Sequence, residues 1–165
     1  MPDLLIFAPC QKAILANDNT ISAISVMDVV RVGPIPPNTV DLPKGSLIPM
    51  SWNILTLWYG TEEDVGVTYQ QRCELLAKSS DLLNDPATAL GKSPVVTDFS
   101  FTQAGQRRPV IHLIFNFPVW IEGPCSLRLL IKQKDADEWV ERATYPLVVE
   151  YQRAELIPSQ QRATS

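Results

Sequence analysis

The chain has 165 residues, of which 45% are hydrophobic and 19% charged, and its 14 basic and 18 acidic side chains give a formal net charge of -4. This length and apolar content suit one globular domain with a sizeable core and exclude a largely disordered chain. Scattered basic residues and a net negative charge disfavour nucleic-acid binding. Fourteen prolines beside seven glycines argue against a helical bundle, because proline is excluded from helix interiors.

Two apolar segments open the chain. Residues 4–15 and 20–32 are rich in Leu, Ile, Val and Phe and flank residues 17–19, Asn-Asp-Asn, which tolerate the positive φ of a tight turn. This pattern predicts a β-hairpin. The apolar run over residues 4–10 follows an acidic residue and is too short for a secretory signal. No later run approaches the ~20 apolar residues of a transmembrane helix, so we expect a cytoplasmic protein and disfavour a membrane role.

The next segments alternate between connection and strand. Residues 33–49 concentrate proline and glycine, which predicts a long connection wrapped over the domain. Residues 51–59 carry apolar side chains on both faces, which predicts a central strand that is covered on both sides and has Trp52 and Trp58 in the core. Residues 62–64, Glu-Glu-Asp, mark an exposed turn.

Two short segments that precede the last third of the sequence also suggest secondary structure. Residues 67–80 fit the spacing of either a strand or a helix, and we favour a strand because the neighbouring segments are strands. Residues 85–91 begin with Asp-Pro and end with Gly, in the positions that favour helix capping, initiation and termination. We therefore expect one short helix near residues 85–91.

The last third has the most regular pattern. Apolar residues alternate with other residues over 95–102, 111–117, 127–131 and 144–151, with turn signals between these segments. Such period-two patterning predicts an antiparallel meander.

The whole pattern predicts an all-β fold, an antiparallel β-sandwich of Ig-like or C2-like layout with the one short helix. We expect a single domain over residues 1–158 and a flexible polar tail over residues 159–165.

The motifs of common enzymes are missing from the sequence. The single histidine, His112, lies mid-strand with no GxSxG sequence, so a satisfied strand residue is favoured over a catalytic base. Cys10, Cys73 and Cys125 are far apart with no CxxC spacing, which favours reduced thiols over a metal site or disulfides. No glycine-rich phosphate loop is present, and we expect no cofactor.

Three weaker features are candidates for binding. Arg107 and Arg108 form the only adjacent basic pair. Trp120 lies near a predicted strand end, where an exposed indole is a plausible contact residue, although a core position is commoner. The acidic turn with Asp135, Asp137 and Glu138 could offer oxygen ligands to a cation, although acidic residues are ordinary in exposed turns.

Two stretches resemble a known family. Residues 5–14 with the turn that follows look like the N-terminal hairpin of small bacterial proteins classed as domains of unknown function. Residues 117–124 are an apolar stretch that ends in Glu-Gly-Pro and precedes the strand over 127–131. This order is similar to a β-sandwich pattern in which an apolar stretch, a glycine and a strand lead to a final strand, here over 145–151. The resemblance implies a β-sandwich without known catalytic residues, so it assigns no site.

We therefore expect a non-enzymatic protein-interaction or structural module that binds a protein partner or a second copy of itself. The alternative functions are a small metal-dependent hydrolase and a calcium- or membrane-binding C2-like domain.

Overall fold

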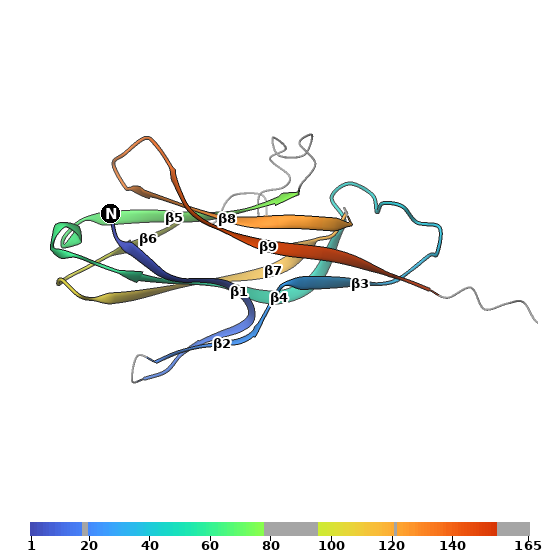
Figure 1. The fold of residues 1–165 in the computed structure, drawn as a ribbon, viewed down its shortest axis with the longest axis horizontal. Helices are drawn as coiled ribbons and strands as arrows, with labels where there is room; N and C mark the ends of the chain where they lie inside the picture. The colour runs from blue at the N-terminus through green and yellow to red at the C-terminus, as the bar shows by residue number, and fades with distance from the viewer. Residues whose placement is uncertain (18–19, 78–95, 121, 155–165) are drawn as a thin grey trace, which may run out of the picture.

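The computed structural model describes residues 1–17, 20–77, 96–120 and 122–154, which fold into two β-sheets packed face to face (Figure 1). The fold is all-β, as the sequence pattern predicts. The helix expected near residues 85–91 and the tail over 159–165 lie outside the described residues. Among the described residues, no helix has the length and apolar content needed to cross a membrane.

The first sheet has the strand order β2-β1-β4-β7, and the second has the order β3-β9-β8-β5-β6. The strands of the first sheet are β1 (Asp3–Leu15), β2 (Ile21–Val26), β4 (Leu47–Tyr59) and β7 (Arg107–Pro118). Those of the second sheet are β3 (Val29–Ile35), β5 (Thr68–Ala77), β6 (Val96–Ser100), β8 (Gly123–Gln133) and β9 (Val140–Arg153). A 3₁₀ turn over Glu62–Asp64 joins β4 to β5.

β4 is the central strand of the first sheet, as its sequence predicts. Trp52, Ile54 and Trp58 alternate along the strand and are fully buried against the second sheet. The ring of Trp58 stacks on that of Phe99 with centroids 5.5 Å apart, which ties β4 to β6 across the core. Burial of large aromatic side chains between the sheets supplies the main apolar stabilisation of the sandwich.

The connectivity is that of an Ig-type sandwich, with one parallel pair where antiparallel strands were predicted. β3 pairs with β9 in parallel. Residues 20–32, predicted as one strand, break between β2 and β3 because the chain crosses from the first sheet to the second. The N–H of Met27 donates to Pro9 in the first sheet, whereas the carbonyl of Asp28 accepts from Val148 in the second.

The last third is not a meander. β6 and β7 lie in different sheets, and only β8 and β9 form an antiparallel neighbouring pair. A period of two shows that each strand has one buried face, but both sheets of a sandwich offer an equivalent inner face, so the pattern does not specify the sheet.

The proline-rich connection is shorter than predicted, because β3 runs to Ile35 and β4 begins at Leu47. Pro34 lies in edge strand β3, and Pro49 lies where the register between β4 and β7 shifts. Both are places where a missing backbone N–H costs little.

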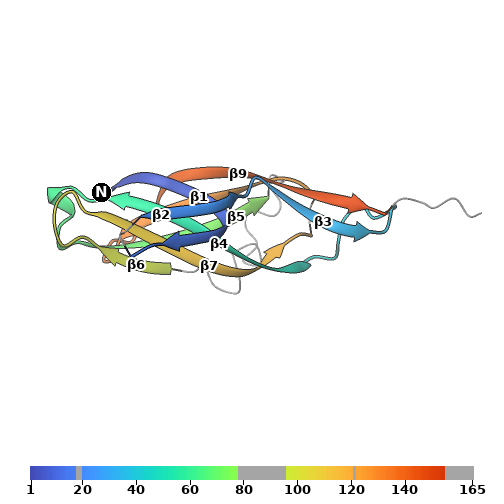
Figure 2. The same ribbon diagram turned by 90° about the horizontal axis from the view of Figure 1, so that it is seen from below.

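The hairpin of β1 and β2 folds back over the outer face of the first sheet. β1 pairs with β4 up to Cys10, and from Cys10 onwards it pairs with β2. Figures 1 and 2 show the hairpin returning towards the end of the molecule where β1 begins. Leu55 and Leu57, on the outer face of β4, are buried beneath this region.

We predict that Gly60→Ala destabilises the fold by about 1–3 kcal/mol, as expected for overpacking. A Cβ at Gly60 would lie 2.5 Å from the ring of Phe101, which is buried in the core. Urea denaturation measures the change, with Ser51→Ala at an exposed position of β4 as the control. Equal stability of Gly60→Ala and the unmodified protein would show that the Phe101 ring can move aside.

Candidate binding site

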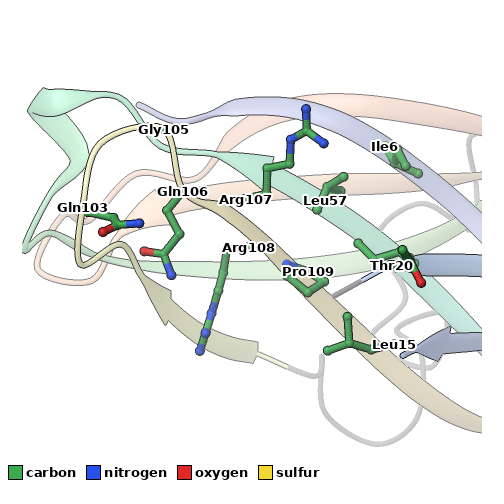
Figure 3. Close-up of a pocket in the computed structure, with 11 residues that line it drawn as sticks. Ile6, Leu15, Thr20, Leu57, Gln103, Gly105, Gln106, Arg107, Arg108 and Pro109 are labelled. Carbon is green, nitrogen blue, oxygen red and sulfur yellow. The ribbon is translucent and has the colours of Figure 1, made fainter. Parts of the chain in front are cut away.

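A pocket of about 940 Å³ opens between Leu15, Thr20 and Ile21 of the hairpin and the start of β7 (Figure 3). Three parts of the chain line it: the hairpin with β1, the outer face of β4, and the β6–β7 loop with the first residues of β7. The lining residues are Ile6, Leu15, Thr20, Ile21, Leu57, Gln103, Gly105, Gln106, Arg107, Arg108 and Pro109.

The floor of the pocket is apolar. Ile6 and Pro109 both pair with Leu57, one from each neighbouring strand, so the three side chains share the outer face of the first sheet. Leu57 is buried, whereas Ile6 and Leu15 remain 39% and 48% exposed. The pocket therefore presents apolar side chains to solvent.

The predicted basic pair lies at this pocket, but its two side chains diverge. Neighbouring residues of a strand point to opposite faces, and Arg107 has the parity of Pro109. Figure 3 shows Arg107 directed towards the side of Leu57 and Ile6, and Arg108 directed away from it. In the part of the chain that the structure describes, neither guanidinium has an ion-pair partner, and the pocket has no acidic lining residue.

Strand β7 also forms a free edge of the first sheet among the described strands. Leu113 and Phe115 share the outer face with Pro109 and are 53% and 63% exposed. Exposed apolar side chains on a long edge strand are a known template for pairing with another chain.

The backbone geometry of this edge follows from one proline. Pro109 has no backbone N–H, so it suits a pair with Leu57 that exchanges no backbone hydrogen bonds. In such a pair the backbone groups of both residues point away from the partner strand, so the carbonyl of Pro109 points to the free edge of β7. The next carbonyl oxygen, that of Val110, lies 3.3 Å from the Thr56 hydroxyl oxygen of β4 and is therefore directed to β4. Backbone groups of alternate residues thus point alternately towards β4 and away from it.

A polar network is buried in the core between the sheets. Gln71 of β5 is fully buried, and its Oε1 accepts from the Thr56 hydroxyl at 2.9 Å and from the Trp58 indole N–H at 2.6 Å. Its Nε2 amide lies 2.5 Å from Nε2 of His112, and the Thr97 hydroxyl lies 3.4 Å from Nδ1. With the Gln71 amide as donor, His112 accepts at Nε2 and carries its proton on Nδ1.

This environment keeps His112 neutral. Burial lowers its pKa to about 4, because a charged imidazolium would lose its hydration inside the core. The imidazole is 4% exposed. His112 therefore has the structural role that its sequence context favours.

The three cysteines are free thiols in the structure. Burial raises the pKa of all three, that of Cys73 to about 12 and that of Cys125 to about 11. Thiols with such pKa values stay protonated at neutral pH and are poor nucleophiles.

Asp64 is a buried carboxylate where the sequence predicts an exposed turn. It accepts from the N–H and hydroxyl of Thr61 at 2.9 and 2.7 Å and from the Tyr69 hydroxyl at 2.6 Å. Burial by itself raises its pKa, but the bonds from Tyr69 and Thr61 outweigh burial, and the pKa lies below its usual value. Threonine followed by an acidic residue three positions later is a capping signal that could have identified it.

Two other predicted candidates lie outside the pocket. Trp120 is 7% exposed, so it takes the commoner buried position and not that of an exposed contact residue. Asp135, Asp137 and Glu138 lie exposed in the turn between β8 and β9. Among the described residues, no group of three His, Cys, Asp or Glu side chains is placed to hold a metal ion.

The outer face of the second sheet has a different character. Glu74 of β5 forms ion pairs with Arg72 at 3.0 Å and Arg128 at 2.5 Å, and the Arg72 guanidinium stacks 4.5 Å from the Trp139 ring. Arg72 and Arg128 therefore share one carboxylate on this face. A partly apolar pocket beside two arginines is found on the first sheet.

No protein-family model matches the sequence, and no curated protein matches it. Among solved structures, the chain is similar to the CARDB domain of the PF1109 protein from Pyrococcus furiosus, crystallised in complex with di-metal ions. The match covers 91% of this chain and 90% of that chain at 13% identity, with a TM-score of 0.39. Similarity at this level supports no inference about ligands or function. Membership of the small bacterial family stays a prediction.

We predict that the free energy of unfolding falls by about 3 kcal/mol between pH 7 and pH 4 through His112 alone, from its pKa shift of about 6.5 to about 4. The unfolded histidine takes up a proton near its usual pKa, while the folded one stays neutral until about pH 4. The unfolded state thus binds more protons in this window, and stability rises with pH.

Urea denaturation across this pH range measures the effect, with His112→Gln as the comparison. Acidic side chains titrate in both proteins, so the contribution of His112 is the difference between their two slopes. Parallel pH profiles would show that His112 does not titrate as the buried geometry requires.

Proposed function

We propose that this chain is a non-enzymatic binding module that takes an extended segment of a partner protein as an added strand along β7. The observation that carries the proposal is the free edge of this strand, on which Leu113 and Phe115 are exposed. Strand addition obtains affinity from backbone hydrogen bonds and specificity from alternate side chains.

The backbone of β7 offers the hydrogen bonds that an added strand needs. The alternation set at Pro109 directs the backbone groups of Ile111, Leu113 and Phe115 to the free edge. An added strand would pair with these groups and extend the first sheet by one strand.

The side chains of the edge favour an apolar partner segment. Natural edge strands are protected from pairing by charged residues and prolines. β7 has such residues only at its two ends, at Arg107, Arg108 and Pro109 and at Pro118, and residues 110–117, with a neutral His112, carry no charge. The unprotected part coincides with the exposed apolar side chains.

The state of the reactive side chains supports a module without catalysis. His112 is bonded to Gln71 and Thr97 inside the core, and the thiols have raised pKa values. Three free cysteines also support a reducing compartment such as the cytoplasm.

The test is panning of a phage-displayed library of random peptides that match the twelve residues of β7 in length. We expect enriched peptides to bind the purified protein in fluorescence anisotropy. Leu113→Pro, which removes one edge N–H, should weaken their binding about tenfold or more, in line with the cost of lost hydrogen bonds and packing. Phe115→Lys should have the same effect through its side chain.

Val140→Lys is the matched control, because it places a charge at an exposed apolar residue of β9 in the second sheet. Circular dichroism establishes that each variant is folded. Enriched peptides that bind Leu113→Pro as tightly as the unmodified protein would exclude strand addition at β7. A dimer in sedimentation analysis that Leu113→Pro dissociates would instead make the occupant a second copy of the chain.

A further inference from the structure

We infer that the pocket beneath the hairpin is a binding site for a small organic anion that carries an apolar body. Its carboxylate or phosphate group would bind Arg107, and its apolar part would lie over Ile6, Leu57 and Leu15. This inference stands on the pocket and not on the edge of β7, so it is independent of the proposed strand addition.

The charge of the pocket selects an anion. Among the described residues, Arg107 has no ion pair and no Asp or Glu lines the pocket. On the outer face of the second sheet, in contrast, Arg72 and Arg128 both form an ion pair with Glu74. A guanidinium suits carboxylate and phosphate groups because it can donate two parallel hydrogen bonds.

The walls of the pocket select an apolar body. Leu57 forms the floor, Ile6 stands beside it on β1, and Leu15 and Ile21 face it from the hairpin. Ile6 and Leu15 keep large exposed fractions at the edge of a buried floor. An apolar ligand would remove these side chains from water, at about 25 cal/mol for each Å² covered.

The position of Arg107 allows one ligand to place its anionic group on the guanidinium and its apolar body on the floor of the pocket. Its strand parity places it on the face shared by Pro109, Leu57 and Ile6, and Figure 3 shows it on that side of β7. Arg108 points away from this floor. The volume of about 940 Å³ lies within the range of small-molecule sites, roughly 300–1,000 Å³.

The probes are octanoate and octyl phosphate, which share the anionic head and apolar tail but differ in the source of charge. Isothermal titration calorimetry with the full chain should show saturable binding of at least one of them, with one ligand per chain. Octyltrimethylammonium, with the opposite charge, should not bind. Acetate and inorganic phosphate, which lack the tail, should bind at least about tenfold more weakly than their octyl counterparts, consistent with apolar burial.

Arg107→Gln should weaken binding of the octyl anion about tenfold, the loss expected for a hydrogen bond to a charged group. Lys12→Gln removes the same charge from an exposed position of β1 outside the pocket lining and should leave the affinity within about twofold, since long-range charge effects are screened. Leu15→Ser should weaken binding through the exposed wall without disturbing the core. Leu113→Pro should leave it unchanged, which separates this site from the edge of β7.

Equal losses for Arg107→Gln and Lys12→Gln would overturn the inference, because attraction would then come from net charge alone. Binding of octyltrimethylammonium at similar affinity would also overturn it, since the pocket would be taking any amphiphile. If neither octyl anion gives binding heat or a thermal shift, the inference is wrong, and the pocket is only a gap beneath the hairpin.

Discussion

The amide of Gln71 is the polar group on which the packing of the two sheets depends. It comes from the second sheet and is bonded to Thr56, Trp58 and His112, all of the first sheet. A buried amide without partners is costly, so the sandwich is stable only when both sheets hold these groups in register. The network fixes one arrangement, and it does so through directional bonds.

This constraint also positions the candidate surfaces. His112 fixes the middle of β7 from the inner side, and the ladder with β4 fixes its backbone. The outer side of the same strand is then free to carry exposed groups: Arg107 at the pocket, and Leu113 and Phe115 along the edge. One strand thus serves the core with one face and solvent with the other, as alternation along a strand requires. The candidate surfaces therefore lie on a strand that is held from its inner side, and the hairpin and the β6–β7 loop supply the remaining walls of the pocket.

The sequence predicted those features that depend on local pattern. Both faces of β4 are apolar, and its place at the centre of a sheet followed from that alone. Sheet membership could not be predicted, because the inner faces of two sheets demand the same alternation. Asp64 is buried although acidic, since its cost is offset by bonds to Tyr69 and Thr61, and Tyr69 lies on another element. Arg107 and Arg108 were identified as a pair, but their divergence and the pocket depend on how the hairpin folds back.

The place of β9 between β3 and β8 has a consequence for how the chain assembles as the ribosome makes it. All four strands of the first sheet are complete once residue 118 has been added, whereas among the described strands β3 finds its only neighbour in β9. At roughly 5–20 residues per second, synthesis of the remaining strands takes on the order of seconds. For that time the aromatic inner face of the nascent first sheet lacks its final cover, and Trp52 and Phe117 are part of that face. During synthesis this inner face is therefore apolar surface of the kind that chaperones bind, until β8 and β9 complete the second sheet.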